Sequence, residues 1–181
     1  GFSIKSGLVP FHGWLPDAYQ SAPAPVSIML GGIVTKMVGV YAIIRIVSNL
    51  LVESDTVVNT CFMVLALMSI IYGAVAAGQK DFKRLLGYSS ISQIGYIILG
   101  VSTGNILGYI GAIFHFFNHA TFKTTLFVNS AAVEQQTGLS DITKMGGLHK
   151  QMPITGTSNI IAFLSAVGIP PLAGFWSKLF I

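Results

Sequence analysis

The sequence predicts an all-α, polytopic bundle of transmembrane helices that forms a single domain over residues 1–181. Its composition is the first reason: hydrophobic residues make up 52% of the chain and charged residues 9%, with a mean hydropathy of +0.73. Soluble domains carry about 25% charged residues. The second reason is length, because the apolar segments hold the roughly 20 residues that a helix needs to cross a bilayer. The third is their separation by short polar or glycine-containing turns.

The elements follow in order along the chain. Residues 1–9 are expected to be the end of an upstream helix that stops at Pro10. The proline-rich stretch 10–25 is expected to be irregular and interfacial, with Trp14 and Tyr19 at the membrane surface. Helices are then predicted over the following ranges: 26–51, 57–78, 85–103, 106–133 and 153–181, the last broken at Pro170 and Pro171.

The ends of the chain and its loops suggest context and orientation. The chain opens and stops inside apolar patterns, so we expect an internal piece of a longer membrane protein. Counting crossings places the loops 10–25, 79–84 and 134–152 on one side. These loops carry most of the basic residues, so the positive-inside rule predicts that they are cytoplasmic, in what we expect to be a prokaryotic plasma membrane. Arg45, near the opposite side, is expected to extend its side chain to the interface.

Several classes of function are excluded or disfavoured. The net charge of +4 is not gathered into a basic run, so nucleic acid is not an expected partner. Cys61 is the single cysteine, which rules out an intrachain disulfide and a cysteine cluster for zinc or iron–sulfur ligation; we expect a buried thiol. No phosphate loop or nucleotide, flavin or quinone fingerprint is present. We therefore expect no cofactor and no redox chemistry in this chain.

Lysine inside apolar segments is the most informative feature. Lys36 lies near the middle of the predicted helix 26–51, where an ammonium costs roughly 3 kcal/mol on insertion scales. Its side chain is too far from either interface to reach water, which leaves a functional role or a static buried ion pair as the alternatives. Lys5 and Lys178 each lie beside a proline break, and broken helices at membrane depth line protein or water-filled cavities.

A stripe of titratable residues follows in the helix 106–133. His115, His119 and Lys123 are spaced by four, which places them about 40° apart in sequence around one helix face. Histidine both donates and accepts protons near neutrality, so the stripe is predicted to be a proton relay. A structural histidine cluster is one alternative. Metal binding by the histidine pair is another, although no nearby Glu or Cys supplies further ligands.

The segments that carry these residues resemble a known family. The resemblance is to the antiporter-like, proton-translocating membrane subunits of respiratory complex I, Mrp cation/proton antiporters and membrane-bound hydrogenases, including formate hydrogenlyase. It covers nearly the whole chain and is most specific over the following stretches: 7–18, 22–27, 35–41, 81–96, 115–127 and 168–178.

The resemblance implies about fourteen helices in the complete protein, with two inverted five-helix repeats and two broken helices. It also implies roles. Lys5 matches the lysine of the first broken helix, whose acidic partner should lie upstream, and Lys36 matches a bridging lysine. His115, His119 and Lys123 match a central relay, and Lys178 matches the ionisable residue of the second broken helix.

The function predicted from these observations is translocation of protons, or of protons in exchange for a cation. The chain is then a subunit of a redox-driven or antiporter complex, and its partners are the lipid bilayer, other membrane subunits and protons. Two alternatives stay open. One is coupling to Na⁺ or K⁺, and the other is a passive membrane scaffold whose buried lysines only form structural pairs.

Overall fold

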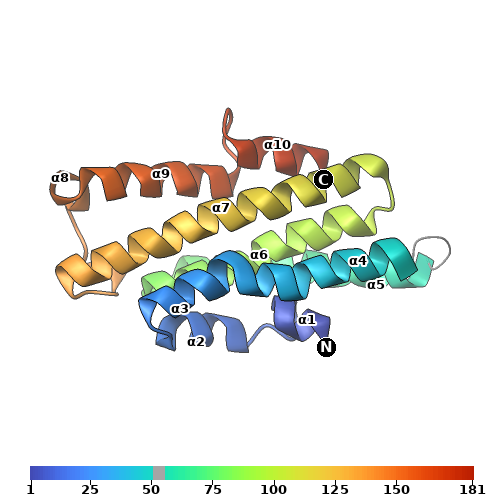
Figure 1. Cartoon of the computed structure of the whole chain (residues 1–181), viewed down its shortest axis with the longest axis horizontal. Helices are drawn as coiled ribbons and strands as arrows, with labels where there is room; N and C mark the ends of the chain where they lie inside the picture. The colour runs from blue at the N-terminus through green and yellow to red at the C-terminus, as the bar shows by residue number, and fades with distance from the viewer. Residues whose placement is uncertain (51–55) are drawn as a thin grey trace.

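A computed structural model describes residues 1–50 and 56–181, without the side chains of 48–50. The helices lie side by side along one long axis (Figure 1). The described residues contain no strand, apart from one isolated bridge between Asp81 and Asp141. The prediction of an all-α bundle is confirmed.

Two long helices form the centre of the bundle. Helix α6 (Phe82–Ser102) packs against α5 (Thr56–Tyr72) and its 3₁₀ extension η2 (Gly73–Gly78). Helix α7 (Ile106–Thr137) packs along α6 and runs the length of the bundle (Figure 1). Both are longer than predicted: α6 begins at Phe82 rather than 85, and α7 ends at Thr137 rather than 133.

Side-chain caps start both central helices. The Asp81 carboxylate accepts a hydrogen bond from the Arg84 backbone N–H at 2.9 Å, and the Asn105 side-chain oxygen accepts one from the Gly108 N–H at 2.6 Å. Each cap satisfies a backbone donor that the first turn of a helix leaves free. The cap at Asp81 explains why α6 begins inside the predicted basic loop.

We expect Asp81→Ala to lower the free energy of unfolding by about 1 kcal/mol, because the first turn of α6 loses its cap. Asp81→Asn keeps a capping oxygen and should stay close to the parent. The check is the midpoint of thermal unfolding of the full-length protein in detergent. Equal destabilisation by both substitutions would show that the negative charge matters rather than the cap.

The N-terminal region differs from the prediction. Helix α1 (Phe2–Ser6) ends at Gly7, whose φ of 74° favours glycine, and not at Pro10. The stretch 10–25 is also more regular than expected, because it contains α2 (Trp14–Ser21). Tyr19 on α2 is fully buried, so its expected place at the membrane surface is wrong.

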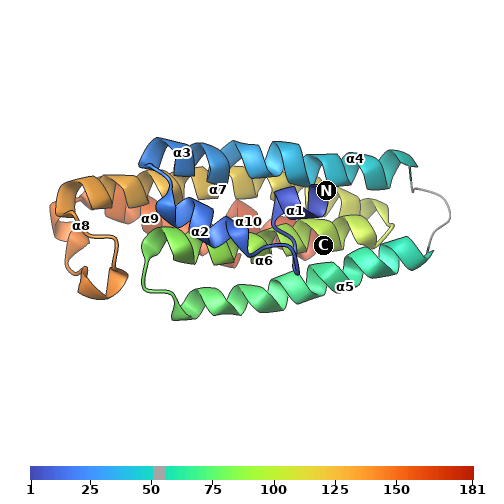
Figure 2. The same cartoon turned by 90° about the horizontal axis from the view of Figure 1, so that it is seen from below.

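The helix that carries Lys36 contains an unusual middle section. It starts as α3 (Ala24–Met29), continues as a π-helix η1 (Leu30–Val40) and ends as α4 (Tyr41–Leu50). The predicted end at 51 lies outside the described residues. In Figure 2 this helix runs along one edge of the bundle, with α5 on the opposite edge.

The last segment is broken where the sequence predicts. Helix α9 (Pro153–Val167) ends at Gly168, whose φ is 91°, and α10 (Ala173–Phe180) follows after the prolines. Both cover the outer side of α7 (Figure 1). The preceding stretch, predicted as a loop, contains two short helical pieces, η3 (Ile142–Lys144) and α8 (Leu148–Gln151).

Two of the predicted cytoplasmic loops meet at one end of the bundle. The Phe82 N–H donates to the Ser140 carbonyl at 3.1 Å, and the Ile142 N–H donates to the Lys80 carbonyl at 2.8 Å. This end, called the basic end below, carries the following residues: Lys80, Lys83, Arg84, Lys144 and Lys150. The third loop, 10–25, reaches this end through Asp17, which pairs with Arg84 at 3.3 Å.

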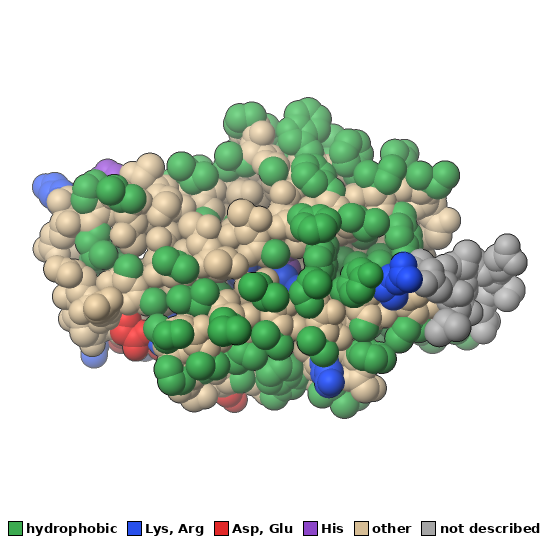
Figure 3. Space-filling view, viewed as in Figure 1, with side chains coloured by type: hydrophobic (Ala, Val, Ile, Leu, Met, Phe, Trp, Pro, Cys, Tyr) green, Lys and Arg blue, Asp and Glu red, His purple; other side chains and the backbone are tan. Residues whose placement is uncertain are grey.

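Three helices of the described residues are long and apolar enough to cross a membrane: Ala24–Val47, Thr56–Gly78 and Phe82–Ser102. Figure 3 shows hydrophobic side chains spread over the middle and right of one face, with few charged groups among them. Cys61 is exposed on α5 and not buried as expected. An apolar outer surface is what a bilayer or neighbouring apolar helices would cover.

Candidate functional site

The predicted stripe on α7 lies inside the bundle. His115 and His119 are completely buried, and Lys123 is 1% exposed. The two histidine rings stack with centroids 6.3 Å apart and an interplanar angle of 7°. Regular α-helical geometry of α7 therefore places the three side chains along one interior line.

His115 is held by hydrogen bonds from two other helices. Its Nε2 lies 2.9 Å from Gln93 Oε1 on α6, and its Nδ1 lies 2.8 Å from the Ser177 hydroxyl on α10. An amide oxygen only accepts, so Nε2 must carry a proton. The Ser177 hydroxyl also lies 3.0 Å from the Gly174 carbonyl. It can donate to a neutral ring at Nδ1, or donate to Gly174 while a protonated ring donates to it.

His119 is different, because neither ring nitrogen has a hydrogen-bond partner in the structure. The groups within electrostatic range of its ring come from three helices: Lys36, Lys123, His115 and Lys178. A buried imidazole without partners is costly. His119 is thus the residue of the interior on which these four titratable groups act.

Lys123 reaches across to α6. Its ammonium donates to the Leu86 carbonyl at 2.8 Å and to the Ser89 hydroxyl. Lys36 also lies within electrostatic range of Lys123. The Lys123 side-chain nitrogen is therefore held by neutral oxygens, with a second lysine within electrostatic range.

Lys36 lies in the π-helical section and is 1% exposed. Its ammonium donates to the Gly31 carbonyl, five residues earlier. The neighbouring Thr35 hydroxyl lies 3.2 Å from the buried Tyr19 hydroxyl. Tight packing accompanies this section, since a Cβ at Gly39 would lie 2.6 Å from the Ser6 backbone nitrogen. π-Helical turns are rare and often mark functional sites.

Lys178 lies at the helix break. Its ammonium donates to the Ala166 and Val167 carbonyls at 2.7 and 3.2 Å, and it lies 4.7 Å above the centre of the Tyr96 ring. The break between α9 and α10 frees these carbonyls from helical bonding. Lys178 is within electrostatic range of His115 as well as His119.

Five of the six predicted lysines and histidines therefore come together. We call the following five residues the Lys–His seam: Lys36, His115, His119, Lys123 and Lys178. Lys5 does not join them, because its side chain is exposed on α1. The helix breaks near Pro10 and at Pro170–Pro171 lie beside Lys5 and Lys178, and the second supplies the carbonyls that hold Lys178.

No described carboxylate lies in the seam. Glu134 pairs with Lys83 at 2.7 Å and Asp17 with Arg84 at 3.3 Å, both at the basic end. Asp141 is also there, where hydrogen bonds from the Thr143 hydroxyl and N–H hold the pKa of its carboxyl below the usual value. Glu53 and Asp55 lie outside the described residues. Among those described, no three His, Cys, Asp or Glu side chains are grouped to hold a metal ion.

Sequence reasoning missed several residues of the site. Gln93 and Ser177 hold His115, and Tyr19 and Thr35 lie beside Lys36. The polar face of α6 was a signal for Gln93. A glycine-rich run, Gly31–Gly32 followed by Gly39, was the signal that the Lys36 helix departs from regular α geometry.

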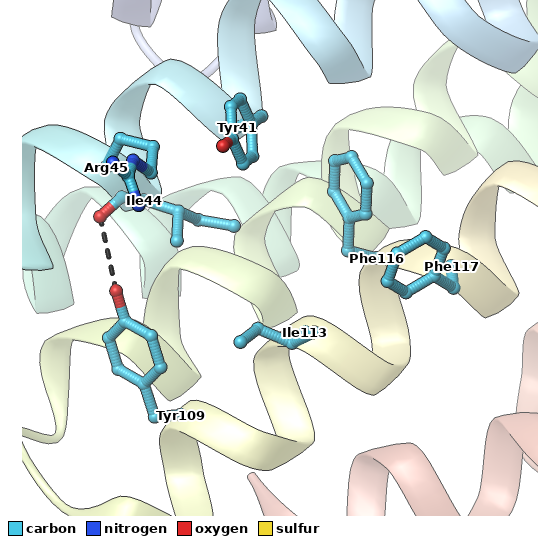
Figure 4. Close-up of a pocket in the computed structure, with 7 residues that line it drawn as sticks. All are labelled: Tyr41, Ile44, Arg45, Tyr109, Ile113, Phe116 and Phe117. Atoms are coloured by element: carbon cyan, nitrogen blue, oxygen red, sulfur yellow. Dashed lines mark hydrogen bonds between the residues drawn. The ribbon is translucent and has the colours of Figure 1, made fainter.

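A separate apolar cavity of about 260 Å³ lies between α4 and α7 (Figure 4). Tyr41 and Arg45 line it from α4, and Tyr109 and Phe117 line it from α7. The Tyr109 hydroxyl donates to the Ile44 carbonyl at 3.2 Å. Arg45 is exposed at this cavity, and none of the seam residues lines it.

Comparison with known proteins gives the family. The chain is 40% identical to subunit N of the NADH-quinone oxidoreductase of Desulforudis audaxviator, with 100% of this chain and 36% of the relative aligned. It is 39% identical to a subunit of the Na⁺/H⁺ antiporter of Alkalihalophilus pseudofirmus, with 98% of this chain and 36% of the relative aligned. The chain therefore spans about a third of the length of these relatives.

A solved structure and a family model point to the same group of proteins. The structure matches a chain of the Mrp complex from Dietzia sp. DQ12-45-1b with a TM-score of 0.94 and 32% identity, covering 99% of this chain and 33% of that one. The family model described as "NADH:quinone oxidoreductase/Mrp antiporter, TM" matches residues 1–181. This integral membrane chain belongs to the family of transmembrane subunits shared by NADH:quinone oxidoreductases and Mrp antiporters.

Proposed function

We propose that this chain carries protons through the membrane as part of an antiporter-like subunit. The observation that supports the proposal best is the Lys–His seam itself. It joins titratable groups from three helical segments in the bundle interior, without a described carboxylate to make them static ion pairs. Structural buried charges are normally paired.

The order of the groups suggests a path. Lys36 is within electrostatic range of Lys123 and His119, and Lys178 is within range of His119 and His115. A proton that enters the seam moves among Lys36, Lys123 and His119, each lysine accepting it as a neutral amine, then passes to His115 and leaves at Lys178. His115 accepts it at Nδ1 while the Ser177 hydroxyl turns to Gly174. The same nitrogen then releases it toward Lys178, because Nε2 keeps its proton on Gln93 Oε1. Short water chains would bridge the gaps, as histidine relays commonly require.

Other subunits and the membrane complete the proposal. The relatives are named as subunits of quinone oxidoreductases and antiporters, and we propose that this chain likewise works inside a multisubunit membrane complex. Charge movement elsewhere in that complex would drive proton transfer along the Lys–His seam. The concentration of lysine and arginine at the basic end favours a cytoplasmic location for it, in a prokaryotic plasma membrane.

The test is proton uptake by inside-out membrane vesicles that carry the full-length protein with Lys123→Ala in its complex. We expect at least about a tenfold fall in the initial rate, because a positioned proton carrier contributes factors of about 10²–10⁴. The amount of assembled complex should be unchanged. Lys80→Ala, at a lysine of the basic end outside the seam, is the control. Unchanged uptake, or lost assembly with normal uptake per complex, would favour the scaffold alternative.

A second candidate is exchange of protons for Na⁺ or K⁺. The Ala166 and Val167 carbonyls at the helix break favour it, because carbonyl oxygens bind hard cations and broken membrane helices often supply them. Uptake measured with and without added Na⁺ or K⁺ separates the two candidates. A rate that is independent of both cations would leave protons as the only transported ion.

A further inference from the structure

One buried lysine outside the Lys–His seam reaches a carboxylate. Lys83, on the first turn of α6, lies 2.7 Å from Glu134, on the last turns of α7. The lysine side chain is 8% exposed, whereas the Glu134 side chain is 41% exposed. Both line an open cavity of about 520 Å³ at the basic end, with Gln20, Pro23 and Gln135 among its walls. The pair thus has one member inside the bundle and one facing water.

Glu134 lies on the same face of α7 as the seam. It follows Lys123 by eleven residues, which places the two about 20° apart around the helix and about 16 Å apart along it. Ser130, seven residues after Lys123, lies on that face between them and is buried. The face therefore carries a carboxylate, a hydroxyl and an ammonium in line from the cavity inward.

The side of α6 that faces α7 also contacts Lys123. The Leu86 carbonyl, one turn after Lys83, accepts hydrogen bonds from both Lys123 Nζ at 2.8 Å and the Ser90 hydroxyl at 2.9 Å. Ser90 itself follows Lys83 by seven residues and so shares its face of α6. The turn of α6 that follows the ion pair is thus the turn that holds Lys123.

A neighbouring ion pair lacks these features. Arg84, next to Lys83 in the sequence, pairs with Asp17 at 3.3 Å, and both side chains are more exposed, at 38% and 66%. Asp17 belongs to α2 and not to α7. The two pairs lie at the same end of the bundle, yet only Lys83–Glu134 adjoins the seam.

We propose that Glu134 collects protons from the aqueous phase at the basic end and passes them toward Lys123. This inference rests on the proposed function. The carboxylate takes a proton from water or a buffer acid in the cavity and becomes a neutral acid, which breaks its ion pair with Lys83. It then releases that proton to water and hydroxyl groups on the way to Lys123 and pairs with Lys83 again. Lys83 stays an ammonium throughout, and it is the one other titratable group among the described residues that line the cavity.

Two substitutions that break the same ion pair provide the test. Glu134→Gln removes the carboxylate, and Lys83→Met removes only the ammonium. In inside-out vesicles with the full-length protein in its complex, we expect Glu134→Gln to lower the initial rate of proton uptake about tenfold at about pH 8. Lys83→Met should stay within about twofold of the parent, and Glu134→Asp should recover at least about half of the rate. A purely structural pair predicts equal losses for Glu134→Gln and Lys83→Met and would overturn the proposal.

The pH dependence and a matched control sharpen the result. The loss in Glu134→Gln should shrink at about pH 6, because collection limits the rate only when protons are scarce. Asp17→Asn, in the exposed neighbouring pair, should leave the rate unchanged at both pH values. Equal losses under the acidic and the alkaline condition would contradict a collecting role.

Lys123→Ala, measured beside these variants, separates the two proposals. Collapsed uptake in Lys123→Ala with normal uptake in Glu134→Gln would reject the role of Glu134 and keep the proposed function. Normal uptake in both variants would reject both proposals.

Discussion

Lys36→Met is expected to reduce proton uptake by at least about tenfold while the complex still assembles. Lys36 is the seam residue within range of both Lys123 and His119, so its removal takes out the group that connects them. Methionine fills a similar volume without charge. Replacing a buried charge by an apolar side chain is often neutral or stabilising when no partner charge is left behind. The measurement is uptake per assembled complex in inside-out vesicles.

The same substitution also tests the scaffold alternative. If an acid elsewhere in the complete protein pairs with Lys36, removing the lysine leaves a buried carboxylate uncompensated, at a cost of about 3–5 kcal/mol. Assembly would then fail before uptake could be measured. Lys144→Met is the control, since the Lys144 side chain is 69% exposed and lies 3.9 Å from Asp141 at the surface. Lys144→Met should change neither the amount of assembled complex nor the proton uptake per complex.

Gly174→Ala is expected to be the most damaging single methyl addition to the fold. A Cβ on Gly174 would overlap the Ser165 carbonyl oxygen and lie 2.8 Å from its carbon, and both are backbone atoms of α9. Backbone atoms cannot move away by a change of rotamer as a side chain can. We therefore expect the free energy of unfolding to fall by about 3 kcal/mol, at the upper end of typical overpacking costs. The shift of α10 would also move Ser177 from His115 and Lys178 from its carbonyls.

The readouts for Gly174→Ala are the thermal midpoint of the full-length protein in detergent and its proton uptake. Gly146→Ala is the matched control, because a Cβ there meets nothing within 4 Å and its φ is not positive. If Gly174→Ala keeps the parent midpoint, then α9 and α10 can separate without cost, and the close approach at the break is not a structural requirement.

The sequence was most informative where a helix is regular. The four-residue spacing of His115, His119 and Lys123 predicts one helix face, and α7 has that face in the interior. Composition was enough to predict the class of fold, because few charges and long apolar runs leave little choice but membrane helices.

Contacts between helices could not be predicted in this way. Spacing along a chain tells which residues share a face but not which face of another helix lies opposite. Gln93 and Ser177 meet His115 only because α6 and α10 both pack on α7. The Lys83–Glu134 pair was missed for a related reason, since both residues were predicted in loops and both are helical.

The π-helical section of the Lys36 helix shows a different limit. A period of about 3.6 residues assigns faces only in a regular α-helix. From Leu30 to Val40 the period is longer, so residues on either side of Lys36 fall on other faces than the pattern predicts. Tyr19 was misplaced for a simpler reason: its hydroxyl finds a buried partner in Thr35, so the tyrosine does not need the interface.

The stacking of the two histidine rings limits how many protons the interior can hold at once. Unit charges 6.3 Å apart repel by about 3 kcal/mol at an effective dielectric constant of about 20. A proton on one ring therefore makes a proton on the other roughly a hundredfold less favourable. In the proposed path, protons then cross this stretch one after another, each leaving before the next arrives, and the slowest single hop sets the rate of transport.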